Sequence, residues 1–393
     1  MTQTDFDEII DRTGTACSKW DDMQAIYGVA PGDGISMWVA DMDFRPPASV
    51  QRAVEGIAAH GVYGYPGANR AYLDAIRWWM ANRHGWTVEP DWILTTHGLV
   101  NAVGLCVDAL TQPGDAVILM TPVYHAFARV TRAAGREVTE FPLALAEGEY
   151  RMDWEAWAGL MTGRERMLIL CSPHNPGGRV WTEGELREVV AFCEAHDLIL
   201  ISDEIHHDLV MPGHRHHVLA RLCPEAAPRL ISLTAATKTF NIAGAHIGNM
   251  IIADEALRRV VQGRMAALGI SPGLFGLNMV AAAYSPEGAE WVDALVRYLD
   301  GNRQVFDAGV AAIPGLRSMP LQATYLAWVD FAGTGMTRPE FTARVERDAR
   351  IAANHGPSFG AGGEDFMRFN LATPRARVVE AVQRLREAFG DLQ

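Results

Sequence analysis

The chain has 393 residues, 49% of them hydrophobic, and a formal charge of −13 at pH 7. This length predicts about two or three domains with a sizeable core, and the acidic charge argues against a nucleic-acid partner, because phosphate binding needs clustered Lys and Arg. No apolar run approaches the roughly 18 residues of a membrane-spanning helix, so we expect no membrane partner.

The start of the chain and its cysteines favour a cytoplasmic protein. The opening stretch MTQTDFDEIIDRTG is acidic and polar, unlike a secretory signal or a transit peptide. The five cysteines are odd in number and form no CxxC pair, which is typical of reduced thiols.

Strand-like apolar runs alternate with helical patterns through the middle of the chain. We expect strands at residues 92–96, 116–120, 167–171, 198–202, 230–234 and 249–253, with helices between them, including 103–110 and 186–193. The second of these helices opens with a capping-box pattern from Thr182 to Glu185. Apolar strands alternating with helices predict an α/β fold, in which a mostly parallel sheet is covered by helices on both faces.

The last hundred or so residues have a different pattern. Strands are expected at 324–329 and 366–371, and helices at 339–353 and near the end of the chain, where Val378, Val382, Leu385 and Phe389 share one face. This predicts a smaller α+β domain, separated from the rest near the pattern break at 286–288.

Lys238 is the most unusual charged residue in the sequence. It lies in SLTAATKTFNIAG, just after an expected strand, and is the only charged residue between Arg229 and His246. A surface lysine on a loop would explain it. Burial would instead lower its pKa, and a neutral amine can form a Schiff base with an aldehyde.

Asp203 follows another expected strand in LILISDEIHHDL. A carboxylate at a buried strand end needs a partner, such as a protonated pyridine nitrogen, and His206 could reach a phenolic oxygen on the same ring. A helix cap or a turn is the plainer interpretation of Asp203. The region also contains five histidines, His206, His207, His214, His216 and His217. Their spacing matches no zinc pattern, so we expect no metal site.

Two turns add polar groups beside these strands. Asn175, in CSPHNPGGRVW, would lie next to Asp203 if their strands are neighbours, although a simple turn also explains it. In TTHGLVNAV a strand runs through Gly98 directly into a helix, whose first N–H groups, at Gly98, Leu99 and Val100, suit a phosphate monoester. The pattern is neither GxGxxG nor a P-loop.

Arg368 lies in the expected strand FMRFNLA, on the face opposite Met367 and Phe369. An arginine binds a carboxylate with two parallel hydrogen bonds. The alternative is an arginine that faces solvent.

These residues could bind an aldehyde, a pyridinium, a phenolate and a phosphate. All four groups occur in pyridoxal 5′-phosphate, which is therefore the predicted cofactor. Motifs along nearly the whole chain add a resemblance: MWVADMDF, GVYGYPG, PVYHAF, CSPHNPGGRVW, SDEIHHDL, TKTFNIAG and FMRFNLATP. The chain resembles the fold-type I pyridoxal-phosphate enzymes of the aspartate aminotransferase superfamily. It is most similar to their MalY/PatB-type cystathionine β-lyase, or C–S lyase, branch.

The resemblance implies a domain organisation and an assembly. Residues 49–285 would form the large cofactor-binding domain, and residues 1–48 and 286–393 together a discontinuous small domain. The family also implies a homodimer with active sites at the subunit interface.

The resemblance further implies roles for single residues. Lys238 would carry the cofactor and move protons, and Asp203 would pair with the pyridine nitrogen. Arg368 would bind the substrate α-carboxylate, helped by Trp38 and the backbone at Ala40. Tyr124 would stack on the cofactor ring, and the hydroxyl of Thr237 would bind the phosphate. Asn175, with His206 nearby, would contact the ring hydroxyl. Tyr63 or Tyr65 would reach the site of the partner subunit.

The chain also departs from the family pattern. His97 stands where a proline is frequent, and His246 stands where aminotransferases commonly have a phosphate-binding arginine.

The expected reaction is β-elimination from L-cystathionine or a related cysteine S-conjugate, giving pyruvate, ammonia and a thiol. The main alternative is an aminotransferase, since both reactions begin with removal of the α proton by the freed lysine. A non-catalytic cofactor-binding protein is disfavoured by the intact Lys238, Asp203, Asn175 and Arg368. A nicotinamide oxidoreductase is disfavoured because the glycine fingerprint is absent.

Overall fold

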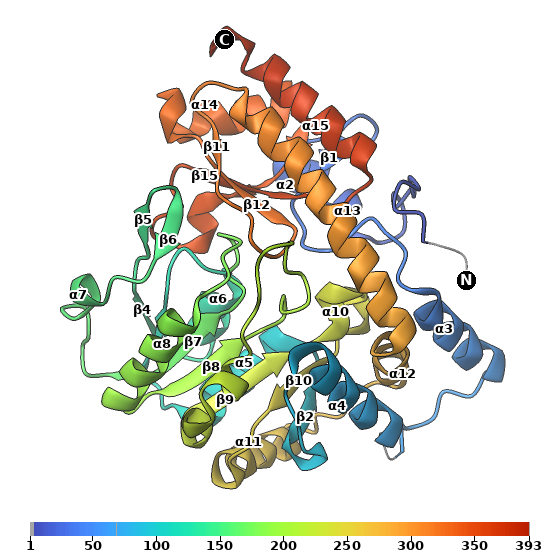
Figure 1. Cartoon of the computed structure of the whole chain (residues 1–393), viewed down its shortest axis with the longest axis vertical. Coiled ribbons are helices and arrows are strands. Elements are labelled where there is room, and N and C mark those ends of the chain that lie inside the picture. The colour runs from blue at the N-terminus through green and yellow to red at the C-terminus, as the bar shows by residue number, and fades with distance from the viewer. Residues whose placement is uncertain (1–3, 68, 393) are drawn as a thin grey trace.

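A seven-stranded sheet forms the centre of the computed structural model, which describes residues 4–67 and 69–392 (Figure 1). The prediction of a mostly parallel sheet is confirmed, because β10 alone in this sheet runs against its neighbours. In spatial order the strands are β2 (Ile93–Thr96), β10 (Gly248–Ile251), β9 (Leu230–Thr234), β8 (Ile199–Asp203), β7 (Glu165–Cys171), β3 (Ala116–Leu119) and β4 (Glu137–Glu140).

Helices cover both faces of this sheet, as predicted. Alternate residues along β7 enter different clusters: Met167 and Ile169 pack on one face, and Leu168 and Leu170 on the other. The first face is covered by α5 (Leu99–Leu110), α6 (Ala126–Ala133) and α11 (Glu255–Ala267). The second is covered by α7 (Trp154–Trp157), α8 (Glu183–Ala195) and α9 (Leu219–Leu222), and α8 begins with the predicted capping box at Thr182.

Further helices close the β2 end of the sheet. Helix α12 (Leu274–Ala283) packs against α3 (Ala48–His60) and α4 (Arg70–His84). The short helix α10 (Ala236–Thr239) follows β9 and carries Lys238, and a small hairpin of β5 (Ala144–Ala146) and β6 (Glu149–Arg151) lies at the far end.

A second sheet of four short strands lies in the C-terminal part of the chain. Its order is β11 (Arg317–Ser318), β12 (Leu326–Asp330), β15 (Phe366–Asn370) and β14 (Asn354–His355), and the long helix α13 (Pro286–Ala311) packs on α15 (Arg375–Ala388) above it (Figure 1). The N-terminal segment, with α1 (Ser18–Asp21), α2 (Met23–Tyr27) and β1 (Ile35–Ser36), joins this part because β1 pairs with β13 (Ile351–Ala352). This pairing supports the discontinuous small domain, whose exact limits stay a prediction.

The predicted helix at 339–353 is wrong in its second half. Helix α14 (Arg338–Ala343) continues as one π-helical turn (Arg344–Asp348), and Arg350 then adopts a positive φ of 56°. The chain next enters β13, where Ile351 and Ala352 are fully buried against β1. This pairing with a strand from the opposite end of the chain overrides the local helical pattern.

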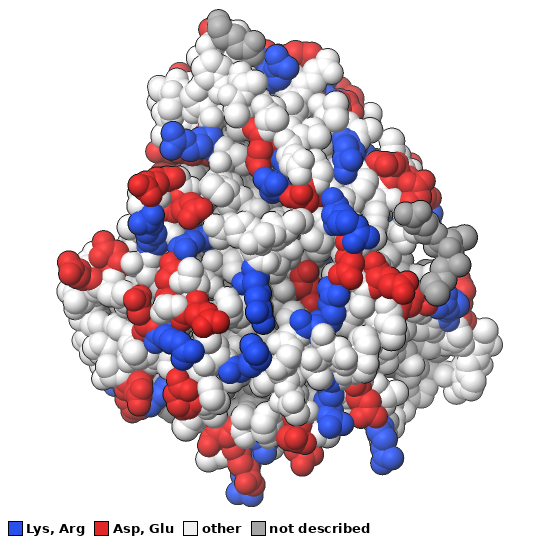
Figure 2. All heavy atoms as spheres, viewed as in Figure 1, with Lys and Arg blue, Asp and Glu red and all other residues white. Residues whose placement is uncertain are grey.

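The surface carries charges of both signs. Figure 2 shows acidic and basic side chains intermingled over the face drawn there. Among the described residues no helix is long and apolar enough to cross a bilayer. All five cysteines are free thiols.

Candidate active site

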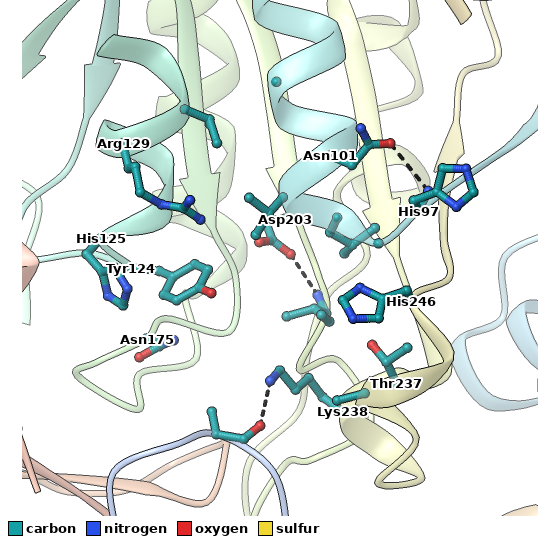
Figure 3. A pocket seen from close by; sticks show the side chains of 18 of the residues that line it. His97, Asn101, Tyr124, His125, Arg129, Asn175, Asp203, Thr237, Lys238 and His246 are labelled. Atoms are coloured by element: carbon teal, nitrogen blue, oxygen red, sulfur yellow. Dashed lines mark hydrogen bonds between the residues drawn. The ribbon is translucent and has the colours of Figure 1, made fainter. Parts of the chain in front are cut away.

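A cavity of about 890 Å³ opens at the carboxyl ends of the parallel strands (Figure 3). It brings together residues that are far apart in the sequence, because the turns after β2, β7, β8 and β9 all reach this edge of the sheet. Apart from Tyr63 and Tyr65, every residue predicted for the site lines it: Trp38, Ala40, Gly98, Leu99, Val100, Tyr124, Asn175, Asp203, His206, Thr237, Lys238 and Arg368, together with His97 and His246.

Lys238 projects into this cavity from α10. The sequence placed it at a strand end, but β9 ends at Thr234 and a single helical turn carries the lysine. Its Nζ donates a 2.5 Å hydrogen bond to the carbonyl of Ala40. Burial lowers the pKa of Lys238 to about 8, with Arg368 adding to the effect, while Asp41 and Asp203 oppose it. A neutral amine is therefore accessible near physiological pH.

Asp203 is the last residue of β8 and is 5% exposed. Its Oδ1 accepts a 3.1 Å hydrogen bond from the backbone N–H of Ile205, and no described residue forms an ion pair with it. Burial raises the pKa of Asp203 to about 7, and the charge of Lys238 only partly offsets this. A cationic ring nitrogen in the cavity would stabilise the ionised carboxylate.

The predicted anion site is built around the start of α5. Gly98 precedes the helix with a φ of +86°, a conformation that favours glycine. Across from it, a Cβ on Gly248 would lie 2.5 Å from Cδ2 of Leu99, so glycine allows β10 to approach this turn. The first N–H groups of α5 and the nearby Thr237 therefore form a cradle of donors, with His97 and His246 at its exposed edge (Figure 3).

Arg368 is buried on β15, so the solvent-facing alternative is wrong. Its Nη1 donates to Oδ1 of Asn175 at 2.9 Å, and its Nη2 donates to Oδ1 of Asn354 at 2.6 Å and to the carbonyl of Trp38 at 3.0 Å. Its Nε is buried without a partner. Burial lowers the pKa of Arg368 to about 10, which leaves it cationic.

His206 and Tyr124 also line the cavity. His206 is 2% exposed, and its Nδ1 has no partner. Burial, together with the charges of Lys238 and Arg368, holds the pKa of His206 well below its usual value, so the ring is neutral. The ring of Tyr124 points into the cavity above Asn175 (Figure 3).

A model of the family described as aminotransferase class I and II matches residues 38–385. The chain belongs to this family. Cystathionine beta-lyase PatB from Bacillus subtilis is 35% identical over 387 residues, which cover 98% of this chain and 99% of PatB. Protein MalY from Escherichia coli is 30% identical, covering 96% of this chain and 97% of MalY. The crystal structure of cystalysin from Treponema denticola, which contains a pyridoxal 5′-phosphate cofactor, matches with a TM-score of 0.94 at 33% identity over 100% of both chains.

The residues of this family member fit pyridoxal phosphate. The cavity offers an amine, a carboxylate that lacks a cation, and a helix N-terminus within one space. Two residues that line it each have a buried nitrogen without a partner in the protein, Nδ1 of His206 and Nε of Arg368. Since buried polar groups are rarely left unpaired, these atoms indicate a site built for polar ligands.

The carbonyl of Ala40 is already hydrogen-bonded within the protein, and the two predicted tyrosines lie away from the cavity. The carbonyl of Ala40 already accepts hydrogen bonds from Lys238 and from the hydroxyl of Tyr325, so in this structure it positions the lysine. Tyr63 and Tyr65 lie outside the cavity and are 60% and 102% exposed. Their role toward a partner subunit stays a prediction.

Sequence reasoning missed several residues of the cavity. His125, which precedes α6, and Arg129 within α6 line it at i, i+4 spacing directly after Tyr124, and that spacing was a usable signal. Asn354 contacts Arg368 because the two residues pair across β14 and β15. No local sequence pattern predicts such a cross-strand contact.

Proposed function

We propose that this protein is a pyridoxal-phosphate-dependent C–S β-lyase that cleaves L-cystathionine or a related cysteine S-conjugate. With one water, cystathionine would give homocysteine, pyruvate and ammonia. The observation that carries the proposal is that Lys238 and Arg368 open into one cavity of a chain that matches PatB from end to end.

The cofactor site is supported by donors and acceptors at its expected positions. When bound, pyridoxal phosphate supplies an aldehyde for the substrate amine and a ring that accepts the electrons left when Cα loses its proton. Asp203 would keep the ring nitrogen protonated. The start of α5 and the hydroxyl of Thr237 would bind the phosphate. Because Asn175 Oδ1 accepts from Arg368, its amide N–H groups are left to donate to the ring hydroxyl.

The substrate and its protons would be handled by Arg368 and Lys238. Arg368 would bind the α-carboxylate, for which its unpaired Nε is available. The neutral amine of Lys238 would take the α proton, and its lowered pKa supports that role. Loss of the thiolate from Cβ would follow.

The test incubates the enzyme with L-cystathionine and no keto acid. Pyruvate, ammonia and homocysteine in equal amounts would support the lyase. Turnover that requires an added keto acid would instead identify an aminotransferase.

We also infer a homodimer in the cytoplasm, with Tyr63 or Tyr65 reaching the partner's site. Exposed apolar side chains support this interface: Val62, Tyr63, Tyr65, Leu268 and Phe275. The ring of Phe275 lies 5.9 Å from that of Tyr63, and Leu268 also lines the cavity. Mixing inactive Lys238→Ala with a double Tyr63→Ala, Tyr65→Ala variant should restore activity, because each hybrid dimer would contain one intact site. Absence of restoration, or a monomer by sedimentation, would contradict the inference.

A further inference from the structure

A second group of ionisable side chains lies outside the Lys238 cavity. It borders a separate cavity of about 480 Å³ at the end of α4, and the two cavities share no lining residue. We propose that His84, His207 and Asp208 form a binding site for a borderline divalent transition-metal ion such as Zn²⁺. The histidines between His206 and His217 show no zinc-binding spacing in the sequence. The proposed site was not visible there because His84 lies on a distant helix and meets His207 only in the folded chain.

The three side chains already have close to the spacing of metal ligands. His84 Nε2 lies 2.8 Å from Asp208 Oδ1, and His207 Nε2 lies 3.1 Å from Asp208 Oδ2. One ligand atom from each residue lies within 4.8 Å of the others. Tetrahedral zinc with bonds of about 2.0–2.1 Å needs ligand atoms about 3.3 Å apart. Shifts of a few tenths of an ångström would bring the two carboxylate contacts to this distance.

The ring of His207 contacts Asp208 through Nε2 but has no aligned hydrogen bond. The side chain is fully buried, and its Nδ1 also lacks a partner. Buried polar groups nearly always have a partner, so this ring needs an explanation. A metal ion held jointly with Asp208 would give Nε2 of His207 a partner beyond its 3.1 Å contact with that carboxylate.

The surroundings orient the carboxylate. Asp208 accepts hydrogen bonds from Nε1 of Trp79 at 3.0 Å and from the hydroxyl of Thr239 at 2.9 Å, which is the outer support that metal-binding carboxylates require.

The cavity side of the group leaves room for a fourth ligand. The ring of His216 lies 6.3 Å from those of both His84 and His207, and its Nε2 contacts Glu204 at 2.8 Å. A water molecule from the cavity, or His216 after a rotation, could complete a four-coordinate site.

The experiment uses untagged holoenzyme that has been stripped of metal with a chelator. We expect one equivalent of Zn²⁺ to bind in calorimetry, one equivalent of Co²⁺ to produce visible d–d absorption, and Mg²⁺ to do neither, since it prefers oxygen ligands. His84→Ala and His207→Ala should each weaken Zn²⁺ binding at least about 100-fold. His214→Ala is the matched control, because His214 lines the same cavity outside the group and should leave the affinity unchanged.

Retained visible absorption of the cofactor would show that the variants fold. If they do not, anomalous scattering from a Zn²⁺-soaked crystal of the wild-type enzyme decides the question. A peak between His84, His207 and Asp208 supports the proposal. A peak elsewhere, no saturable equivalent, or equal affinity in folded His84→Ala and wild type would overturn it and leave only a hydrogen-bonded network around Asp208.

Discussion

Arg368 donates a 2.9 Å hydrogen bond to the side chain of Asn175, joining β15 of the small sheet to the turn after β7 of the central sheet. The contact orients the amide of Asn175 so that its oxygen faces the arginine. Asn354 and the carbonyl of Trp38 hold the other terminal nitrogen of the guanidinium. The proposed carboxylate site and one edge of the proposed cofactor site are thus positioned by the same contact before any ligand binds.

Replacing Arg368 should therefore impair substrate binding more than cofactor binding. We expect Arg368→Ala to raise KM for the amino acid about 10- to 100-fold, because hydrogen bonds to charged groups contribute about 1.5–3 kcal/mol. Arg368→Lys should recover only part of the loss, since an ammonium cannot reproduce the planar fork. Steady-state kinetics with cofactor occupancy measured by absorption checks this. An unchanged KM would remove Arg368 from the substrate site.

Lys238 should be needed both for covalent attachment of the cofactor and for proton transfer. We expect purified wild-type protein to be yellow, and Lys238→Ala to lose that absorption after dialysis against a free amine. Activity should fall by at least about 10²- to 10⁴-fold, the usual contribution of a positioned acid–base group. Lys238→Arg keeps the charge without a usable nucleophile and should behave like the alanine variant. An unchanged spectrum in either variant would contradict the assignment.

The buried carboxyl of Asp203 should make the cofactor-free protein sensitive to pH. Because burial raises its pKa from 3.8 to about 7, the folded state binds more protons than the unfolded state between about pH 4 and 7, and stability falls as pH rises through that window. Asp203→Asn should remove the free-energy cost of ionising this buried carboxyl, about 2–4 kcal/mol at pH 8.

Thermal melts at pH 4 and pH 8 distinguish the effect of ionising Asp203 from a change in stability that is the same at every pH. Without cofactor, Asp203→Asn should melt above wild type at pH 8 and close to it at pH 4. With saturating cofactor the order at pH 8 should reverse, because wild type alone supplies an anion for the ring nitrogen. A variant that is less stable without cofactor at pH 8 would contradict the electrostatic argument.

The close approach of β10 to the α5 turn should depend on Gly248. In Gly248→Ala the new Cβ would meet Leu99 at 2.5 Å and the backbone of Gly98 at 3.3 Å. We expect a loss of about 1–3 kcal/mol in the free energy of unfolding and weaker cofactor binding. Gly244→Ala is the control, since a Cβ there meets no atom within 4 Å. Equal cofactor affinity in the two variants would show that the cradle tolerates the change.

Local physical chemistry was enough to predict much of this architecture from the sequence. Strand periodicity, helix periodicity and the capping box at Thr182 depend on neighbours within one or two turns, and the structure confirms these elements except the second half of the helix predicted at 339–353. The carboxyl ends of parallel strands meet at one edge, so Asp203 and Asn175 could be placed in a common site. The roles of Trp38, Ala40, Tyr124 and Thr237 came only from the resemblance to a known family.

Contacts between distant segments were decided only by the tertiary structure. The pairing of β1 with β13 ends the helix after Asp348, and the cross-strand pair of Asn354 with Arg368 fixes the guanidinium. The meeting of His84 with His207 likewise needs α4 to pack beside the turn after β8. Such contacts gain their free energy from burial and hydrogen bonding between residues far apart in the chain, which local sequence patterns do not encode.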